Sequence, residues 1–306
     1  MEKRKSLRFG IKTGQRYATH DALLAVWQEA DDLPIFEHAW LADHLLGLGS
    51  TPPGPYLEAW TLLAALAART QRLRIGVMVT DNTYRHPALL AKMAATADVL
   101  SHGRLNFGLG TGWSEQQHHA YGIPLPPPGE RVRRLAEACE LIHRLWTEQA
   151  VTFEGRYYQL HEAPCDPKPV QQPFPPFVIG GEGEQTLQVI ARYADVWDCS
   201  VATPDLYDQK RQLLETFCRT LGRDPATIAY SRHISVDPAD LKAVLAETRA
   251  FLAVGATHII YHVPVPASQN ILRRLAEEVA LPLQAEDQAS SDVRSGPVQG
   301  KQPEAD

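Results

Sequence analysis

The chain has 306 residues, of which 44% are hydrophobic, and this content is sufficient for one large hydrophobic core. Its formal net charge of -6 at pH 7 argues against a nucleic-acid partner. No apolar run is long enough to span a membrane, and no signal-peptide core follows the basic first residues, so we expect a cytoplasmic protein with no membrane partner.

Short apolar segments with the pattern of strands alternate with segments of helical pattern along most of the chain. The expected strands cover 8–12, 35–44, 73–80, the glycine-rich stretch 103–113, 177–179, 196–200, 228–236 and 256–262. The expected helices follow them at 23–27, 57–70, 88–100, 131–147, 187–193, 206–221, 241–254 and 268–279. A strand, a loop and a helix thus repeat roughly every 30 residues, as parallel crossovers require.

This repeat predicts an α/β protein with a closed (β/α)8 TIM barrel rather than an open sheet. The proline-rich segment 151–176 interrupts the repeat. It forms an extended insertion between the fourth helix and the fifth strand, which is typical of a functional loop or a lid. We expect the barrel domain to cover residues 1–284 and the small, polar residues 285–306 to form a disordered tail.

The fourth expected strand ends in Gly108-Leu109-Gly110-Thr111-Gly112-Trp113, with glycine at every second position. Glycine leaves one face of the backbone bare, so a flat ligand or a phosphate can approach it closely. Trp113 would then form a wall beside that ligand. The same pattern also fits a tight turn packed beneath a neighbouring element.

Functional residues of a TIM barrel lie at the C-terminal ends of its strands. The residues expected there are Asp43, His44, Thr80, Asp81, 110–113, 180–184, 197–200, Tyr261 and His262. This set is rich in aromatic residues and glycines, and it lacks the spaced histidines of a metallohydrolase. His118 and His119 do not have the i, i+4 spacing of a metal motif, and the four cysteines form no Cys-x-x-Cys pair. The sequence therefore predicts no metal site and no disulfides.

The glycine-rich loop 180–184 lies between a strand and a helix. Free N–H groups at the start of that helix are suited to binding a phosphate. Glu182 and Glu184 carry the wrong charge for such a site, and glycine is common in short loops of this kind. The loop alone therefore leaves both interpretations open.

His44 follows Asp43 at the end of the second expected strand. The ordinary pKa of histidine is near neutrality, which suits a proton donor in general acid catalysis. The alternative is a structural pair of side chains in a loop.

Successive segments of the chain together resemble the signatures of the luciferase-like monooxygenase superfamily. They are most similar to those of the oxidoreductases that use coenzyme F420. The segments are 40–45, 79–87, 108–113, 130–131, 163–171 and 179–183. They occur in the family's order and at its spacing, and the resemblance covers residues 8–283.

The resemblance implies a barrel whose strand ends hold a flavin or deazaflavin. Asp43 and His44 match an Asp-His pair beside the coenzyme ring, in which the histidine can donate a proton. A bulge with a non-prolyl cis peptide is implied near Met78 and Val79, with Thr80 contacting the coenzyme. The other implied coenzyme-binding residues are Gly110, Gly112, Gly180, Gly181, Gly183 and Glu184.

The leading hypothesis is an F420-dependent oxidoreductase that transfers a hydride between the coenzyme and a small organic substrate. Several dehydrogenases of the family have a glutamate proton acceptor where this chain has Trp113, so the direction of transfer stays open. A pocket lined by Trp40, Trp113 and Trp197 would suit a fairly apolar substrate.

Other functions fit the same barrel. One alternative is a monooxygenase that uses FMN reduced by a separate reductase, together with molecular oxygen. Another is a ligand-binding barrel without turnover, or a metal-free hydrolase. Because members of this family are commonly dimers, we also expect a homodimer.

Overall fold

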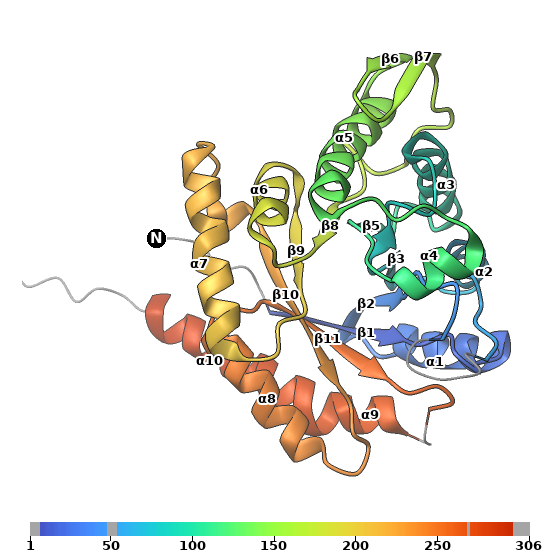
Figure 1. The fold of residues 1–306 in the computed structure, drawn as a ribbon. Coiled ribbons are helices and arrows are strands. Elements are labelled where there is room, and N and C mark those ends of the chain that lie inside the picture. Colours follow the sequence, from blue (N-terminus) through green and yellow to red (C-terminus); the bar gives the residue numbers. More distant parts are fainter. Residues whose placement is uncertain (1–6, 48–53, 268–269, 296–306) are drawn as a thin grey trace, which may run out of the picture.

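The computed structural model describes residues 7–47, 54–267 and 270–295, with side chains up to residue 289. Eight strand positions form a closed parallel barrel (Figure 1). They are β1 (Arg8–Thr13), β2 (Phe36–Leu41), β3 (Arg74–Val77) with β4 (Thr80–Asp81), β5 (Leu105–Gly110), β8 (Phe177–Gly180), β9 (Val196–Cys199), β10 (Ala229–Ser235) and β11 (His258–Val263). Pairing of β3 with β5 closes the barrel, as expected for the TIM-barrel fold.

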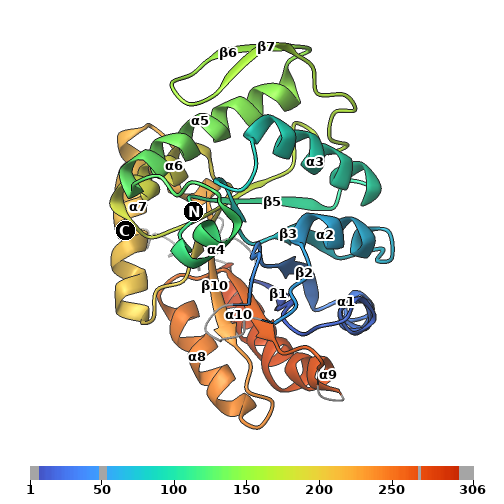
Figure 2. The same cartoon turned by 45° about the vertical axis from the view of Figure 1, so that its right-hand side comes forward.

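Helices surround the barrel on its outside (Figure 2). They are α1 (His20–Asp32), α2 (Ala59–Ala67), α3 (Pro87–Leu100), α4 (Glu115–Tyr121), α5 (Pro128–Thr147), α6 (Glu184–Tyr193), α7 (Pro204–Thr220), α8 (Leu241–Ala253), α9 (Ile271–Leu275) and α10 (Leu281–Ser295). Two shorter helical turns cover Pro225–Thr227 and Ala276–Ala280, and the hairpin of β6 (Val151–Glu154) and β7 (Gln159–Ala163) lies within the expected insertion. Within the described ranges, no helix is long and apolar enough to cross a membrane.

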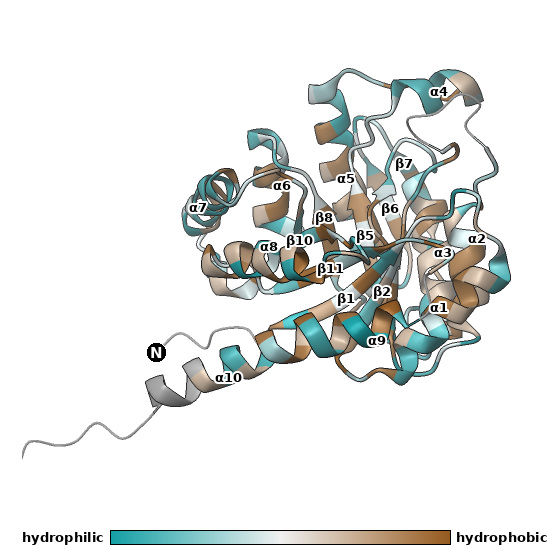
Figure 3. Ribbon diagram, turned by 90° about the horizontal axis from the view of Figure 1, so that it is seen from below, coloured by the Kyte–Doolittle hydropathy of each residue, from teal (hydrophilic) through white to brown (hydrophobic). Residues whose placement is uncertain are grey.

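Local sequence signals account for several helix starts. Thr19 caps α1 by accepting a hydrogen bond from the N–H of Ala22, and Pro87 is the first residue of α3. Serine, threonine and aspartate satisfy free N–H groups at a helix start, whereas proline has no N–H to satisfy there. Hydrophobic residues concentrate on the strands and on the helix faces that cover them (Figure 3).

Two expected boundaries differ from the structure. The third strand is not continuous over 73–80, because a cis peptide between Met78 and Val79 separates β3 from β4. This confirms the cis peptide implied by the resemblance. The chain also stays helical past residue 284, since α10 reaches Ser295. The prediction of a tail disordered from residue 285 is therefore wrong for 285–295, and 296–306 lie outside the described residues.

Alternate residues of each strand point into the barrel, and small residues there make room for large neighbours. A Cβ atom on Gly10 would overlap the ring of His38, and one on Gly76 would overlap the ring of Trp40. Trp40, Met78, Val178 and Ile260 form a small apolar cluster apart from the main core. This cluster lies inside the barrel and leaves a cavity at each end of it.

Candidate active site

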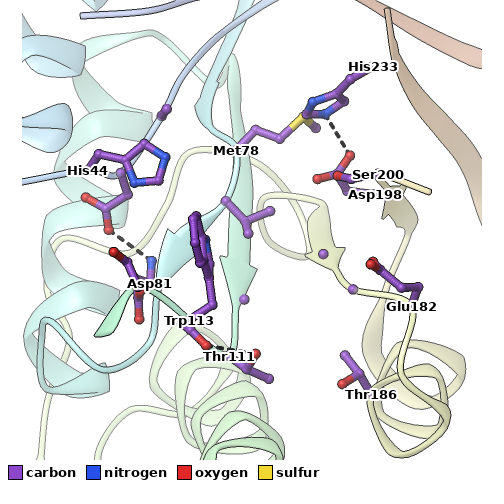
Figure 4. Close-up of a pocket in the computed structure, with 18 of the residues that line it drawn as sticks. His44, Met78, Asp81, Thr111, Trp113, Glu182, Thr186, Asp198, Ser200 and His233 are labelled. Atoms are coloured by element: carbon purple, nitrogen blue, oxygen red, sulfur yellow. Dashed lines mark hydrogen bonds and ion pairs between the residues drawn. The ribbon is translucent and has the colours of Figure 1, made fainter. Parts of the chain in front are cut away.

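A pocket of about 580 Å³ opens at the C-terminal ends of the strands. Its walls come from β1, β4, β5, β8, β9 and β10, from the break between β3 and β4, and from loops such as the one after β2. His44 and Trp113 lie on one side of the pocket, and His233 and Asp198 lie on the other (Figure 4). The fold therefore brings together residues that are far apart in the sequence.

Asp43 is held rigidly at the end of β2. Its carboxylate accepts hydrogen bonds from Arg85 Nη1 at 2.7 Å and Nη2 at 3.0 Å, and from the N–H of Asp81 at 2.9 Å. The Asp43 side chain is only 1% exposed and that of Arg85 11%, so the ion pair is shielded from solvent. Glu58, which caps α2, pairs with the same guanidinium. Asp43 thus joins the loop that follows β2 to the segment that follows β3.

His44 lines the pocket and makes an edge-to-face contact with Trp113, with ring centroids 6.2 Å apart. Burial lowers the pKa of His44 to about 4, with a smaller contribution from the charge of Lys12. The ring is therefore neutral at pH 7, unlike the near-neutral titration expected from the sequence.

Gln117 on α4 determines which nitrogen of His44 carries the proton. The Gln117 oxygen accepts from the N–H of Leu45 at 2.6 Å, so the amide nitrogen is the group that faces His44 Nδ1 at 3.1 Å. Nδ1 accepts this bond, and the hydrogen of the neutral ring is therefore on Nε2. His44 presents a hydrogen-bond donor in this state.

Part of the pocket wall is formed by backbone. Met78 and Val79, joined by the cis peptide, line the pocket together with Gly110 and Gly112. A Cβ atom on Gly110 would lie 2.6 Å from Val79 Cγ2, so glycine is required for this close approach. Gly110 and Gly112 therefore line the pocket, and the missing side chain of Gly110 also makes room for Val79.

The loop that contains Gly180, Gly181 and Gly183 also lines the pocket. Gly183 is the N-cap of α6 and offers no side chain to satisfy the first N–H groups of that helix. Thr186, in the first turn of α6, lines the pocket as well. Free N–H groups and the positive end of the helix dipole make this a site for a phosphate, although Glu182 lies beside it.

A charged cluster lies at the inner end of the pocket. Asp198 on β9 is 2.8 Å from His233 Nε2 on β10 and accepts a hydrogen bond from Ser231 at 3.0 Å. Burial lowers the pKa of Lys12 on β1, while the charge of Asp198 acts in the opposite direction. Burial alone would raise the pKa of Asp198. The charge of His233 and the hydrogen bonds that Asp198 accepts keep this pKa below its usual value.

Two of the three tryptophans expected in this pocket lie elsewhere. Trp40 points into the lower part of the barrel, where its Nε1 donates to His38 Nδ1 at 2.7 Å. Trp197 is fully buried outside the barrel wall, against Tyr207. Its Nε1 donates to the carbonyl of Gly181 at 2.8 Å, so it supports the glycine loop from behind. Only Trp113, 63% exposed, lines the pocket.

Two of the expected coenzyme-binding residues also lie outside the pocket lining. Thr80 is fully buried, and its hydroxyl accepts a hydrogen bond from Trp60 at 3.2 Å. Glu184 is the first residue of α6, and its side chain is exposed. Within the described residues, no group of three or more histidine, cysteine or acidic side chains is placed to hold a metal ion.

The luciferase-like monooxygenase family model matches residues 7–293. The chain belongs to this family. It is 31% identical over 243 residues to an uncharacterized protein of Mycobacterium bovis, a match covering 76% of this chain and 81% of that protein. It is 35% identical over 210 residues to an F420-dependent glucose-6-phosphate dehydrogenase of Kineococcus radiotolerans, covering 66% of this chain and 61% of that protein.

A solved F420-dependent secondary alcohol dehydrogenase, in complex with an F420-acetone adduct, has the same fold. It superposes with a TM-score of 0.80 at 18% identity, covering 89% of this chain and 98% of that structure. Family membership and these relatives make the chain an enzyme of the oxidoreductase class.

This luciferase-like barrel uses pocket residues that the sequence analysis did not select. Lys12 and His233 are examples. Asp198 lies within the expected range 197–200, from which Trp197 was chosen for the pocket; strand residues alternate in direction, so Trp197 and Asp198 cannot both face the barrel interior. No comparable signal distinguished Lys12, which lies in a short strand of ordinary composition.

Proposed function

We propose that this enzyme transfers a hydride between coenzyme F420 and a small organic substrate. The observation that carries the proposal is the arrangement of one pocket, in which Asp43 and His44 lie across from the uncapped start of α6. Met78 and Val79 would contact the ring of the coenzyme, and the free N–H groups after Gly183 would bind its phosphate. The name of the Kineococcus relative supports the same coenzyme.

The residues present fit such a coenzyme. Gly110 and Gly112 line the pocket where the ring of the coenzyme would lie, and the N–H groups at the start of α6 would hold an anionic group. A deazaflavin coenzyme supplies a hydride donor or acceptor, while the protein supplies orientation and proton transfer.

His44 would act on the substrate oxygen. Its Nε2–H is a donor while Gln117 bonds Nδ1, so the neutral ring is suited to donate a hydrogen bond to a carbonyl oxygen and to stabilise the negative charge that hydride transfer places on it. A neutral histidine in this role avoids the cost of burying a charge. Reduction of a carbonyl is the substrate chemistry that this donor supports, because oxidation of an alcohol would need a form of His44 whose Nε2 is free to accept the hydroxyl proton.

The apolar character of the substrate now depends on Trp113 alone, because Trp40 and Trp197 do not line the pocket. Lys12, Asp198 and His233 at the inner end add polar contacts. We therefore propose a substrate whose apolar part packs on Trp113, and whose oxygen lies near His44.

The decisive experiment is a titration of the purified protein with F420 and with FMN, followed by fluorescence. We expect saturable F420 binding that Gly110→Val abolishes, because the added side chain would collide with Val79. Gly129→Ala, in α5 and outside the pocket, is the matched control and should bind F420 like the wild type. Tight FMN binding without any response to F420 would reject the proposal in favour of a monooxygenase supplied by a separate reductase.

A further inference from the structure

A second cavity, of about 540 Å³, lies at the N-terminal ends of the barrel strands. It is lined by the first residues of several strands, including Arg8 of β1 and Arg74 of β3. Among the described residues, Met78 alone lines both this lower cavity and the active-site pocket. The two cavities are therefore on opposite sides of the apolar cluster inside the barrel.

The lower cavity carries cationic hydrogen-bond donors. Arg74 bonds to Asn106 Oδ1 at 2.7 Å and to the side-chain oxygen of Gln171 at 2.7 Å, which fixes its guanidinium in the cavity wall. Arg8 lies 3.5 Å from Glu37, and its side chain is 44% exposed. Asp195 is the acidic residue of the lining, and one of its oxygens accepts from the N–H of Phe177 at 2.8 Å.

His38 adds a donor that has no acceptor. Indole N–H groups only donate, so the bond from Trp40 Nε1 makes His38 Nδ1 an acceptor. Burial lowers the pKa of His38 to about 3, with further contributions from Arg8 and Arg74, and the ring is neutral at pH 7. The hydrogen is therefore on Nε2, which is buried and has no hydrogen-bond partner among the described residues.

An unsatisfied buried donor costs about 1–3 kcal/mol, and the stability of the fold does not require it. An apolar side chain of similar shape in place of His38 would avoid that cost. Arg74 has structural partners in Asn106 and Gln171, but the free Nε2–H of His38 has none. A donor without an acceptor, in a cavity that two arginines also line, is suited to an anion.

The inner wall of the cavity is apolar. Trp40, Met78 and Ile260 line it and belong to the cluster that separates the two cavities. A ligand here would therefore meet cationic groups and an apolar surface together. That combination fits an organic acid better than an inorganic anion, which would leave the apolar wall without a partner.

We propose that the lower cavity binds a small organic carboxylate, with its anionic group at Arg8, Arg74 and His38 and its apolar body against Trp40 and Ile260. This site is separate from the coenzyme pocket, and the proposal does not depend on which coenzyme the enzyme uses.

The probe that tests it is 4-bromobenzoate, whose bromine can be located by anomalous diffraction from crystals of the full-length protein. We expect bromine in the lower cavity. By calorimetry, Arg8→Gln should weaken binding about five- to tenfold, the value of roughly one charge-assisted hydrogen bond. Arg8 is partly exposed, so this variant should fold normally.

Two controls separate the site from general binding. Arg69→Gln removes an exposed charge outside the cavity and should leave the affinity unchanged, and 4-bromobenzyl alcohol, which lacks the charge, should bind at least about tenfold more weakly. Bromine only in the upper pocket, no bromine at all, or an affinity that Arg8→Gln does not change would each overturn the proposal.

Discussion

His44 illustrates how a neighbouring side chain determines the chemistry of a residue. Its ring is neutral because burial disfavours the charged form, and Gln117 on α4 places the remaining hydrogen on Nε2. Asp43, which precedes it, does not bond to the ring but to Arg85. The Asp-His pair therefore consists of one residue that orders the loop and one that is available to a substrate.

At this scale we predict that His44→Ala lowers kcat by about 10²- to 10⁴-fold, the usual contribution of a general acid or base. Coenzyme affinity should change by less than about threefold, because the expected phosphate and ring contacts are made by backbone at other strand ends. Steady-state kinetics and a coenzyme titration measure the two effects. His119→Ala, an exposed histidine of α4, is the control; similar losses in kcat and affinity would assign His44 a binding role instead.

At the scale of elements, the start of α6 and the break in the third strand form the pocket walls. The cis peptide between Met78 and Val79 turns the chain from β3 into β4, and the glycines of β5 and β8 allow close approach to it. Trp197 holds the loop before α6 through the carbonyl of Gly181. Each of these elements contributes backbone rather than a reactive side chain.

The charge beside α6 gives a second prediction. Glu182 lines the pocket next to the free N–H groups, so Glu182→Gln should tighten binding of an anionic coenzyme about two- to fivefold by removing a repulsion of roughly 0.3–1 kcal/mol. The gain should shrink as ionic strength rises, because salt screens exposed charges.

Fluorescence titration at two salt concentrations measures both effects. Glu184→Gln removes a nearby charge from outside the pocket lining and is the matched control. A coenzyme affinity that falls in Glu182→Gln would show that the carboxylate contacts the ligand favourably, and would contradict a phosphate at this helix end.

For the whole molecule, a closed barrel with a cavity at each end buries titratable groups that the unfolded chain exposes to water. His38 is 3% exposed, and burial with the nearby charges lowers its pKa to about 3. The unfolded chain binds this proton below about pH 6.5, whereas the folded protein does not until about pH 3. The contribution of His38 to stability is thus complete above pH 6.5 and is lost as the pH falls.

We therefore predict that His38→Asn flattens the pH dependence of the free energy of unfolding. Between pH 6 and pH 4 the slope should decrease by about 1.4 kcal/mol per pH unit, the value for one proton. The asparagine oxygen keeps an acceptor for Trp40 Nε1. Urea unfolding of both proteins at several pH values measures this slope. The difference between wild type and variant at pH 7.5 gives the part of the change in unfolding free energy that does not come from titration of His38. Parallel curves for the two proteins would contradict the prediction.

The sequence analysis predicted the barrel class because eight strand-helix units repeat along the chain. The resemblance correctly implied the cis peptide at Met78. Helix α4 was not expected, since its seven residues include two adjacent histidines and show no helical spacing of hydrophobic residues. It also continued the third strand through Thr80, because the apolar run itself is unbroken and the cis peptide leaves no mark in hydrophobic pattern.

By itself, the sequence determined the order of strands and helices, and with it the end of the barrel where Asp43, His44 and the two glycine loops meet. Those properties follow from local periodicity and from the chirality of parallel crossovers, which act along the chain. Tertiary structure alone decided that Trp40 and Trp197 leave the pocket while Lys12 and His233 enter it. The direction, protonation and burial of a side chain depend on neighbours brought from distant strands, and Gln117 beside His44 and Trp40 beside His38 are two such neighbours.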